Sequence, residues 1–187
     1  MKHAIVLLAD GFELVEAMTV VDYLRRAEVR VTTAATAAID VRSQSDVLVR
    51  ADELFDEEME LPDAVIIPGG GTGAKNLRED RRVTAFIRRM DQAKHLIAAI
   101  CAGPTVLEAA GILQGRTGTS YPGFENELSY AAYTDRLAHT DGHIITSRGP
   151  ATTIFFAGEI VSALTSKNTW QKLSREILQD LVLAKKQ

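Results

Sequence analysis

Hydrophobic residues along the chain follow two alternating patterns. Short continuous apolar runs, typical of strands buried on both faces, predict strands at residues 4–8, 29–33, 63–67, 96–100 and 144–146. Between them, apolar residues recur every three or four positions, which predicts helices at residues 13–26, 83–90, 105–110, 154–164 and 170–183. The polar and aromatic segment 120–141 has weak periodicity and is expected to form a lobe beside the sheet.

The order of these elements indicates the class of fold. Strand, loop and helix repeat along the chain, as they do in a parallel sheet that helices cover on both faces. Neither an internal repeat nor a linker interrupts the sequence. We therefore expect a single doubly wound α/β domain over residues 1–187, with a mostly parallel central sheet.

The composition is typical of a folded domain, and it limits the expected binding partners and cellular location of the protein. Of the 187 residues, 46% are hydrophobic and 25% are charged, which excludes a disordered or low-complexity chain. The net charge of −4 argues against sequence-independent nucleic-acid binding, which needs a basic surface. The apolar runs are too short for a membrane span. A lone cysteine can form neither an internal disulfide nor a zinc cluster, so a cytoplasmic location is expected.

Three loops that follow predicted strands are the first candidates for a functional site. They comprise residues 10–16, 68–73 and 101–104. In doubly wound sheets, ligands bind beyond the carboxyl ends of the strands. We therefore expect the site where these loops meet.

Cys101 is the first candidate for chemistry. A lone cysteine is commonly a small buried hydrophobe, but Cys101 lies between a predicted strand and a helix that Pro104 opens. Backbone N–H groups and the helix dipole favour a thiolate at such a turn. The sequence therefore predicts a nucleophile on a strand-to-helix elbow, with a pKa below that of a free cysteine.

Two glutamates near the start of the first predicted helix are the next candidates. Glu13 and Glu16 could simply cap this helix, because acids are favoured at helix N-termini. Glu16, however, stands among apolar residues. A buried carboxyl group there would have a raised pKa and could donate a hydrogen bond to a nearby thiolate.

The glycine run and the histidines are further candidates for binding sites. Residues 69–73 lack the Lys-Ser/Thr ending of a phosphate loop, and a tight turn whose N–H groups act as oxyanion donors is the better interpretation. The spacing of the 4 histidines is not that of metal ligands, so no metal site is expected. Of these, His139 and His143 flank a predicted turn and are expected to be exposed.

Four segments together resemble one family. The stretches ADGFELVE, IIPGGGTGAKNL, LIAAICAGPT and TSRGP resemble the ThiJ/PfpI superfamily, in particular its DJ-1-like branch, nearly end to end and in the same order. The resemblance implies a flavodoxin-like sandwich, a homodimer without a cofactor, and a reactive Cys101 that hydrogen-bonds to a protonated Glu16.

The same resemblance assigns roles to four further residues. The backbone N–H groups of Gly70 and Ala102 are expected to line an oxyanion-type pocket. Arg26 and Arg148 match basic positions that the family has near the site or the dimer seam.

The sequence departs from the family pattern in several places. Tyr121 stands where many members carry a histidine before a proline, and Ser45 stands at a second basic position. The elbow reads Cys-Ala-Gly, whereas peptidase-like members have Cys-His-Gly, and no histidine follows His143, whereas related amidotransferases need a late His-x-Glu. Peptidase and amidotransferase activities are therefore disfavoured.

The resemblance leads to two hypotheses of function. The first is a cysteine-dependent stress-response enzyme that acts on reactive dicarbonyls such as methylglyoxal, or on their adducts with proteins, in the manner of a glyoxalase III or deglycase. Because a phenol is a poor base at neutral pH, Tyr121 in place of histidine predicts slow turnover. The second is a non-catalytic redox sensor or holdase-like chaperone whose Cys101 is oxidised to the sulfinate.

Overall fold

The computed structural model describes residues 1–184, so the last three residues of the predicted 1–187 domain lie outside it. A seven-stranded sheet runs through the molecule in the order β10-β11-β7-β6-β1-β2-β5. Its strands are β1 (His3–Leu8), β2 (Arg30–Ala35), β5 (Glu53–Leu54), β6 (Ala64–Ile67), β7 (Leu96–Ile100), β10 (Ala138–Asp141) and β11 (Ile144–Ser147). All neighbours pair in parallel except β10 and β11. The predicted mostly parallel sheet is confirmed.

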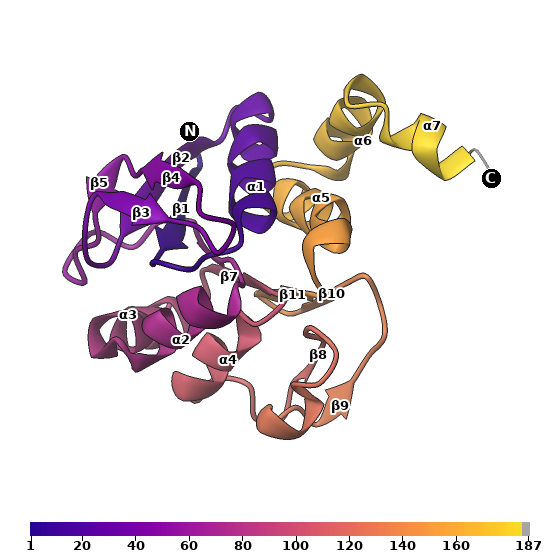
Figure 1. Ribbon diagram of the computed structural model, residues 1–187. Coiled ribbons are helices and arrows are strands. Elements are labelled where there is room, and N and C mark those ends of the chain that lie inside the picture. Colours follow the sequence, from indigo (N-terminus) through magenta and orange to yellow (C-terminus); the bar gives the residue numbers. More distant parts are fainter. Residues whose placement is uncertain (185–187) are drawn as a thin grey trace.

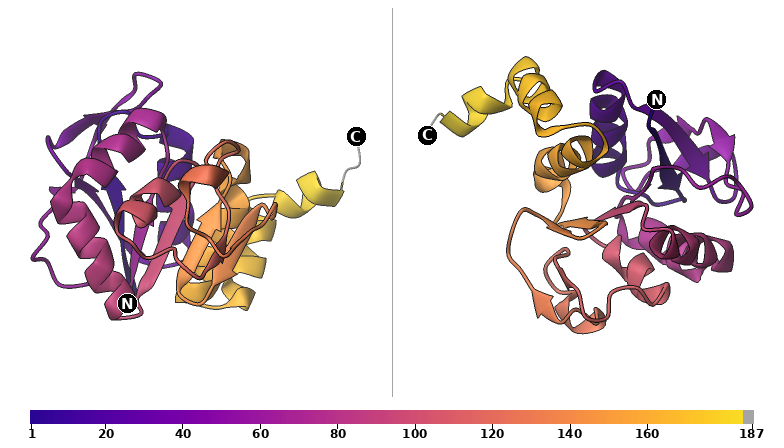
Figure 2. Two further views of the ribbon diagram at one scale, coloured as in Figure 1. Left: turned by 90° about the horizontal axis from the view of Figure 1, so that it is seen from below. Right: turned by 180° about the vertical axis from the view of Figure 1, so that it is seen from behind.

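Helices cover both faces of this sheet (Figure 1). One layer holds α1 (Leu14–Arg26), α5 (Thr153–Leu164) and α6 (Lys167–Glu176), and the other holds α2 (Gly71–Glu79), α3 (Arg81–Gln92) and α4 (Pro104–Ala109). The last helix, α7 (Gln179–Ala184), projects from the body of the molecule in all views (Figure 2). Within residues 1–184, each helix is too short or too polar to cross a bilayer.

Alternate residues of the central strands belong to two separate cores. Ala4, Val6 and Leu8 of β1 pack in the core beneath α1 and α5. Ile5 and Leu7 of the same strand pack in the core beneath α2, α3 and α4. Each fully buried aliphatic side chain contributes roughly 1.5–3 kcal/mol, so both faces need apolar residues. This explains why the strand runs in the sequence are continuous rather than alternating.

The predicted helix over residues 170–183 is wrong, because it is two helices. α6 ends at Glu176, and Leu178 has a φ of +62°, a left-handed conformation that no α-helix continues through. The predicted turn over residues 69–73 is wrong at its end, where α2 begins at Gly71.

The remaining differences concern short polar elements. Two small two-stranded sheets were not predicted: β3 (Asp40–Arg42) with β4 (Leu48–Arg50), and β8 (Thr117–Gly118) with β9 (Ala132–Tyr133). The 120–141 lobe exists in part, but its last strand β10 joins the main sheet. The expected exposure of two histidines is wrong: His143 is half-buried and pairs with Asp91 at 2.7 Å, and His139 has a buried Nδ1.

Candidate active site

Cys101 occupies the turn between β7 and α4, at the carboxyl edge of the sheet (Figure 1). Its φ of +63° is a conformation that residues other than glycine seldom adopt. Its backbone N–H donates to the Ser147 carbonyl and its own carbonyl accepts from the Tyr121 N–H, both at 3.0 Å. These bonds hold the strained elbow from two sides and fix the direction of the half-buried thiol.

Glu16 approaches Cys101 from the first turn of α1. Glu13 caps this helix by accepting from the Val15 N–H, so the capping role belongs to Glu13. Glu16 is instead fully buried, and its Oε2 accepts from the Gly69 N–H at 2.7 Å. Burial raises the pKa of Glu16 to about 7, against the opposing effects of the Gly69 N–H and the Cys101 thiol.

The carboxyl and the thiol pack tightly around Gly69. A methyl group on Gly69 would lie 2.6 Å from Cys101 Cβ and 2.7 Å from Glu16 Oε2. Among the described residues, no hydrogen bond of ordinary geometry joins the two side chains, and Glu16 Oε1 is buried without a partner. When Glu16 is protonated, its O–H needs a hydrogen-bond acceptor. The neighbouring Cys101 sulfur can be this acceptor, because it already interacts with the carboxyl and affects the pKa of Glu16. This arrangement allows the Glu16 carboxyl and the Cys101 thiol to share one proton.

Two backbone N–H groups face the sulfur. Those of Ala102 and Gly70 both interact with Cys101 and lower its pKa. Gly70 has a φ of +89°, and a Cβ there would lie 2.2 Å from the Gly11 carbonyl oxygen, so the turn requires glycine. The two N–H groups that the resemblance assigned to an oxyanion pocket thus lie beside one thiol.

The predicted lowered pKa of Cys101 is wrong. Burial raises the pKa of this thiol to about 12, and the charge of Glu16 and the interaction with its side chain raise it further than Ala102 and Gly70 lower it. The N–H donors expected from the sequence are present, but burial and the carboxylate outweigh them. Between about pH 7 and about pH 12, the pair therefore holds one proton and one negative charge.

The crevice between the ends of β1 and β6, where doubly wound proteins commonly bind cofactors, is filled by backbone. The Glu13 N–H donates to the Gly69 carbonyl at 2.9 Å, and the Gly73 N–H donates to the Gly11 carbonyl at 3.2 Å. Within residues 1–184, no three His, Cys, Asp or Glu side chains are grouped as metal ligands. This edge brings together Cys101, Glu16 and the N–H donors of Gly70 and Ala102.

Tyr121 lies beside the elbow through its backbone. Its N–H donates to the Cys101 carbonyl, while its side chain is 48% exposed. The ring packs along Gly149, where a Cβ would lie 3.3 Å from it. A role of the Tyr121 hydroxyl in proton transfer stays a prediction.

The two arginines are placed differently. Arg26 ends α1, pairs with Asp22 at 2.9 Å and lies ten residues, about 15 Å, along the helix from Glu16, so it does not line the site of its own chain. Arg148 follows β11, the neighbour of β7, and pairs with Asp135 at 2.7 Å. Arg148 therefore borders the elbow, and a role of Arg26 at a dimer seam stays a prediction.

The sequence did not reveal the roles of three residues that shape the site. Gly69 separates the thiol from the carboxyl, and Ser147 holds the elbow through its carbonyl. Both lie inside motifs quoted above, so a signal existed. Asp135 orients Arg148 from the weakly patterned 120–141 segment, where no signal pointed to it.

Comparisons with known proteins show which family the chain resembles. The DJ-1/PfpI family model matches residues 2–163. The Parkinson disease protein 7 homolog of Danio rerio is 41% identical over 169 residues, which cover 87% of this chain and 89% of that protein. A deglycase of Pyrococcus horikoshii is 34% identical over 119 residues, covering 62% of this chain and 71% of that protein.

Solved structures share the whole fold. Drosophila melanogaster DJ-1beta superimposes with a TM-score of 0.89 at 36% identity, covering 95% of this chain and 97% of that one. Oxidized Toxoplasma gondii DJ-1 has a TM-score of 0.91 at 33% identity, covering 95% and 98%. The predicted family and flavodoxin-like fold are confirmed, and the chain belongs to the DJ-1/PfpI family.

Proposed function

We propose that this protein is a DJ-1-like stress-response protein in which Cys101 acts on reactive dicarbonyls or on their adducts with proteins. The observation that carries the proposal is the fully buried Glu16, with a pKa of about 7, packed against Cys101. A group with this pKa can accept and donate protons at neutral pH. The relative in Pyrococcus horikoshii that is named a deglycase supports the substrate class.

The first step follows from the single proton that the pair holds. Cys101 sulfur attacks the aldehyde carbon of a dicarbonyl, a carbon–sulfur bond forms, and the carbonyl electrons move to oxygen. The thiol proton passes to the Glu16 carboxylate, which removes the need for a free thiolate. This matters because the pKa of Cys101 is raised to about 12.

The later steps use the same groups. The N–H groups of Gly70 and Ala102 stabilise the oxyanion until Glu16 returns the proton and completes a hemithioacetal. The Glu16 carboxylate can then move a proton between the two carbons to give a thioester. Water releases an α-hydroxy acid from it and restores the thiol, so no cofactor is consumed.

Turnover of methylglyoxal by purified protein tests this proposal. We expect Cys101→Ser to abolish turnover, and Glu16→Gln to lower kcat by roughly 10²–10⁴-fold, the usual contribution of a general acid–base. Glu13→Gln is the matched control, because it removes a carboxylate three positions away that caps α1. Equal rates in wild type and Cys101→Ser would falsify the enzymatic proposal.

The second candidate function is a redox sensor or holdase-like chaperone. Tyr121 in place of the family histidine favours it, and the solved structure of the Toxoplasma gondii relative is of an oxidized form. Since the chain has 1 cysteine, mild peroxide should add two oxygens to Cys101 and form no internal disulfide. Intact-mass spectrometry checks this, and Glu16→Gln should alter the product if its proton stabilises the sulfinate.

Tyr121→His separates the two candidate functions. If Tyr121 limits proton transfer, histidine should raise dicarbonyl turnover, while Tyr121→Phe serves as the control without a titratable group. Negligible turnover in wild type and in Tyr121→His, with normal oxidation of Cys101, would favour the sensor.

The assembly and location are part of the same proposal. We expect a homodimer in the cytoplasm, with Arg26 near the seam. Neither nucleic acid nor a membrane is an expected partner, given the net charge of −4.

A further inference from the structure

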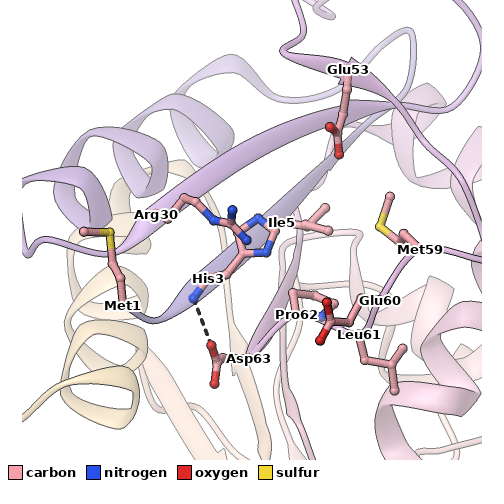
Figure 3. A pocket seen from close by; sticks show the side chains of 10 residues that line it. All are labelled: Met1, His3, Ile5, Arg30, Glu53, Met59, Glu60, Leu61, Pro62 and Asp63. Carbon is pink, nitrogen blue, oxygen red and sulfur yellow. Dashed lines mark hydrogen bonds between the residues drawn. The ribbon is translucent and has the colours of Figure 1, made fainter.

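A cavity of about 430 Å³ opens at the other end of the sheet from Cys101. It lies where β1, β2 and β6 begin, and Figure 3 shows its lining. The lining residues are Met1, His3, Ile5, Arg30, Glu53, Met59, Glu60, Leu61, Pro62 and Asp63. Its volume is that of an ordinary small-molecule site, and the proposed dicarbonyl chemistry does not use it.

Three charged side chains in this cavity have no ion-pair partner among the described residues. They are Arg30, Glu53 and Glu60, all exposed. The fourth charged residue, Asp63, is already engaged, because it accepts from Lys2 Nζ at 2.7 Å and from the His3 N–H at 2.9 Å. The side chains of the cavity thus offer one free positive and two free negative groups.

The four charged side chains lie around the imidazole ring of His3. Its Nε2 lies 3.0 Å from Thr32 Oγ1. Burial lowers the pKa of His3, Arg30 lowers it further, and Glu53, Asp63 and Glu60 raise it, so all four charged residues act on this ring. At neutral pH the imidazole is uncharged, and its Nδ1 has no partner in the described part of the chain.

Apolar side chains complete the cavity. Ile5 on β1 forms part of the floor beside His3, and Met59 and Leu61 come from the acidic segment that precedes β6 (Figure 3). A ligand with an anion, two cations and an apolar stem between them would match these lining groups.

We propose that this cavity binds a free basic amino acid, such as L-arginine or L-lysine. Its α-carboxylate pairs with Arg30, which can bind a carboxylate in a bidentate manner. Its α-ammonium and side-chain cation pair with Glu53 and Glu60, and its methylene stem packs on Ile5, Met59 and Leu61. The ligand charges of two positive and one negative mirror the free charges of the lining.

Isothermal titration calorimetry of wild-type protein with L-arginine tests the proposal, because three analogues each lack one charge. Agmatine lacks the carboxylate, N-acetyl-L-arginine lacks the ammonium, and L-citrulline lacks the side-chain charge. Each should bind at least about tenfold more weakly than L-arginine, since a hydrogen bond to a charged group is commonly worth a factor of ten or more. Equal binding of L-arginine and agmatine, or no binding of L-arginine, overturns the proposal.

Variants locate the binding in this cavity. Arg30→Gln and Glu60→Gln should each weaken L-arginine binding by at least about tenfold. Both residues are exposed and unpaired, so thermal unfolding should be unchanged. The matched control is Glu58→Gln, which removes the same charge from the same segment outside the lining and should bind as wild type. Equal effects of Glu58→Gln and Glu60→Gln would show non-specific charge attraction and overturn the site.

Binding at this cavity is separable from the proposed enzymatic function. Cys101→Ser removes the thiol at the opposite end of the sheet and should leave L-arginine affinity unchanged. Loss of binding in Cys101→Ser would overturn a separate site, whereas absent dicarbonyl turnover has no bearing on it.

Discussion

Cys101 and Glu16 share one buried corner of the molecule, where burial raises the pKa of both and Glu16 raises the pKa of Cys101 further. The backbone N–H groups of Gly70 and Ala102 stabilise negative charge on the sulfur, yet burial and the carboxylate outweigh them. A protein that needed a permanent thiolate would not bury a second acid against it. The arrangement fits chemistry in which the proton leaves the thiol only as the sulfur attacks.

Glu16→Gln should lower the pKa of Cys101 below about 12. The substitution removes the Glu16 charge, while burial, the largest cause of the raised pKa, stays. Ultraviolet absorbance of the thiolate against pH measures the change. Asp22→Asn, which removes an exposed carboxylate from the same helix, is the control and should leave the titration unchanged. An unchanged or higher midpoint in Glu16→Gln contradicts the account of the pair.

Glu16 should also make the stability of the fold depend on pH. Its pKa is about 7 in the folded protein and 4.5 in the unfolded chain, so the folded state binds the proton more tightly. The resulting stabilisation is complete below about pH 4.5 and is lost as the pH rises through about 7, a change of about 3 kcal/mol. Urea unfolding of wild type and Glu16→Gln over this range tests it, because glutamine cannot titrate. Parallel curves for the two proteins contradict it.

The roles of individual residues were predictable where the residues belong to a recognisable motif. They were not predictable where the role depends on how deeply the side chain is buried. Cys101 and Glu16 were recognisable from the sequence, and the structure brings them together. The direction of the Cys101 pKa was not predictable, because it depends on how deeply α1 buries its first turn against the elbow. The pair of Arg148 with Asp135 joins segments whose contact no local pattern reveals.

At the scale of elements, long apolar segments were predicted well and short polar ones were not. The five inner strands of the central sheet, β1, β2, β6, β7 and β11, bury both faces, so their continuous runs identify them and only their ends shift. β3, β4 and β5 are two or three residues long and mostly exposed, so they carry no hydrophobic signal. The break between α6 and α7 was not predictable from the sequence, because leucine is not expected at the φ of +62° that Leu178 adopts.

The two halves of the predicted helix over residues 170–183 should differ in their contribution to stability. Leu173 of α6 is 3% exposed in the core, whereas Leu181 of α7 is 55% exposed. Leu173→Ala should therefore lower the free energy of unfolding by about 2–5 kcal/mol. Leu181→Ala should change it by less than about 0.5 kcal/mol. Denaturant unfolding compares them, and similar losses would mean that α7 packs in solution as α6 does.

At the scale of the whole molecule, the sheet presents different chemistry at its two ends. The carboxyl ends of the strands carry the Cys101 elbow, and the amino ends carry the charged cavity around His3. A six-residue strand such as β1 spans about 20 Å, so the two regions do not touch. Each can therefore be altered while the other is measured.

The expected homodimer has a candidate surface beside Glu16. Val15, Val47 and Leu48 are 48%, 43% and 56% exposed, and Gln44 joins their two segments by donating to Glu13. If a second copy covers this patch, Leu48→Glu should convert a dimer to a monomer, because it would bury an unpaired charge. Leu54→Glu, 54% exposed on the edge strand β5, is the matched control and should stay dimeric. Light scattering measures the mass, and a dimer that survives Leu48→Glu rules this surface out.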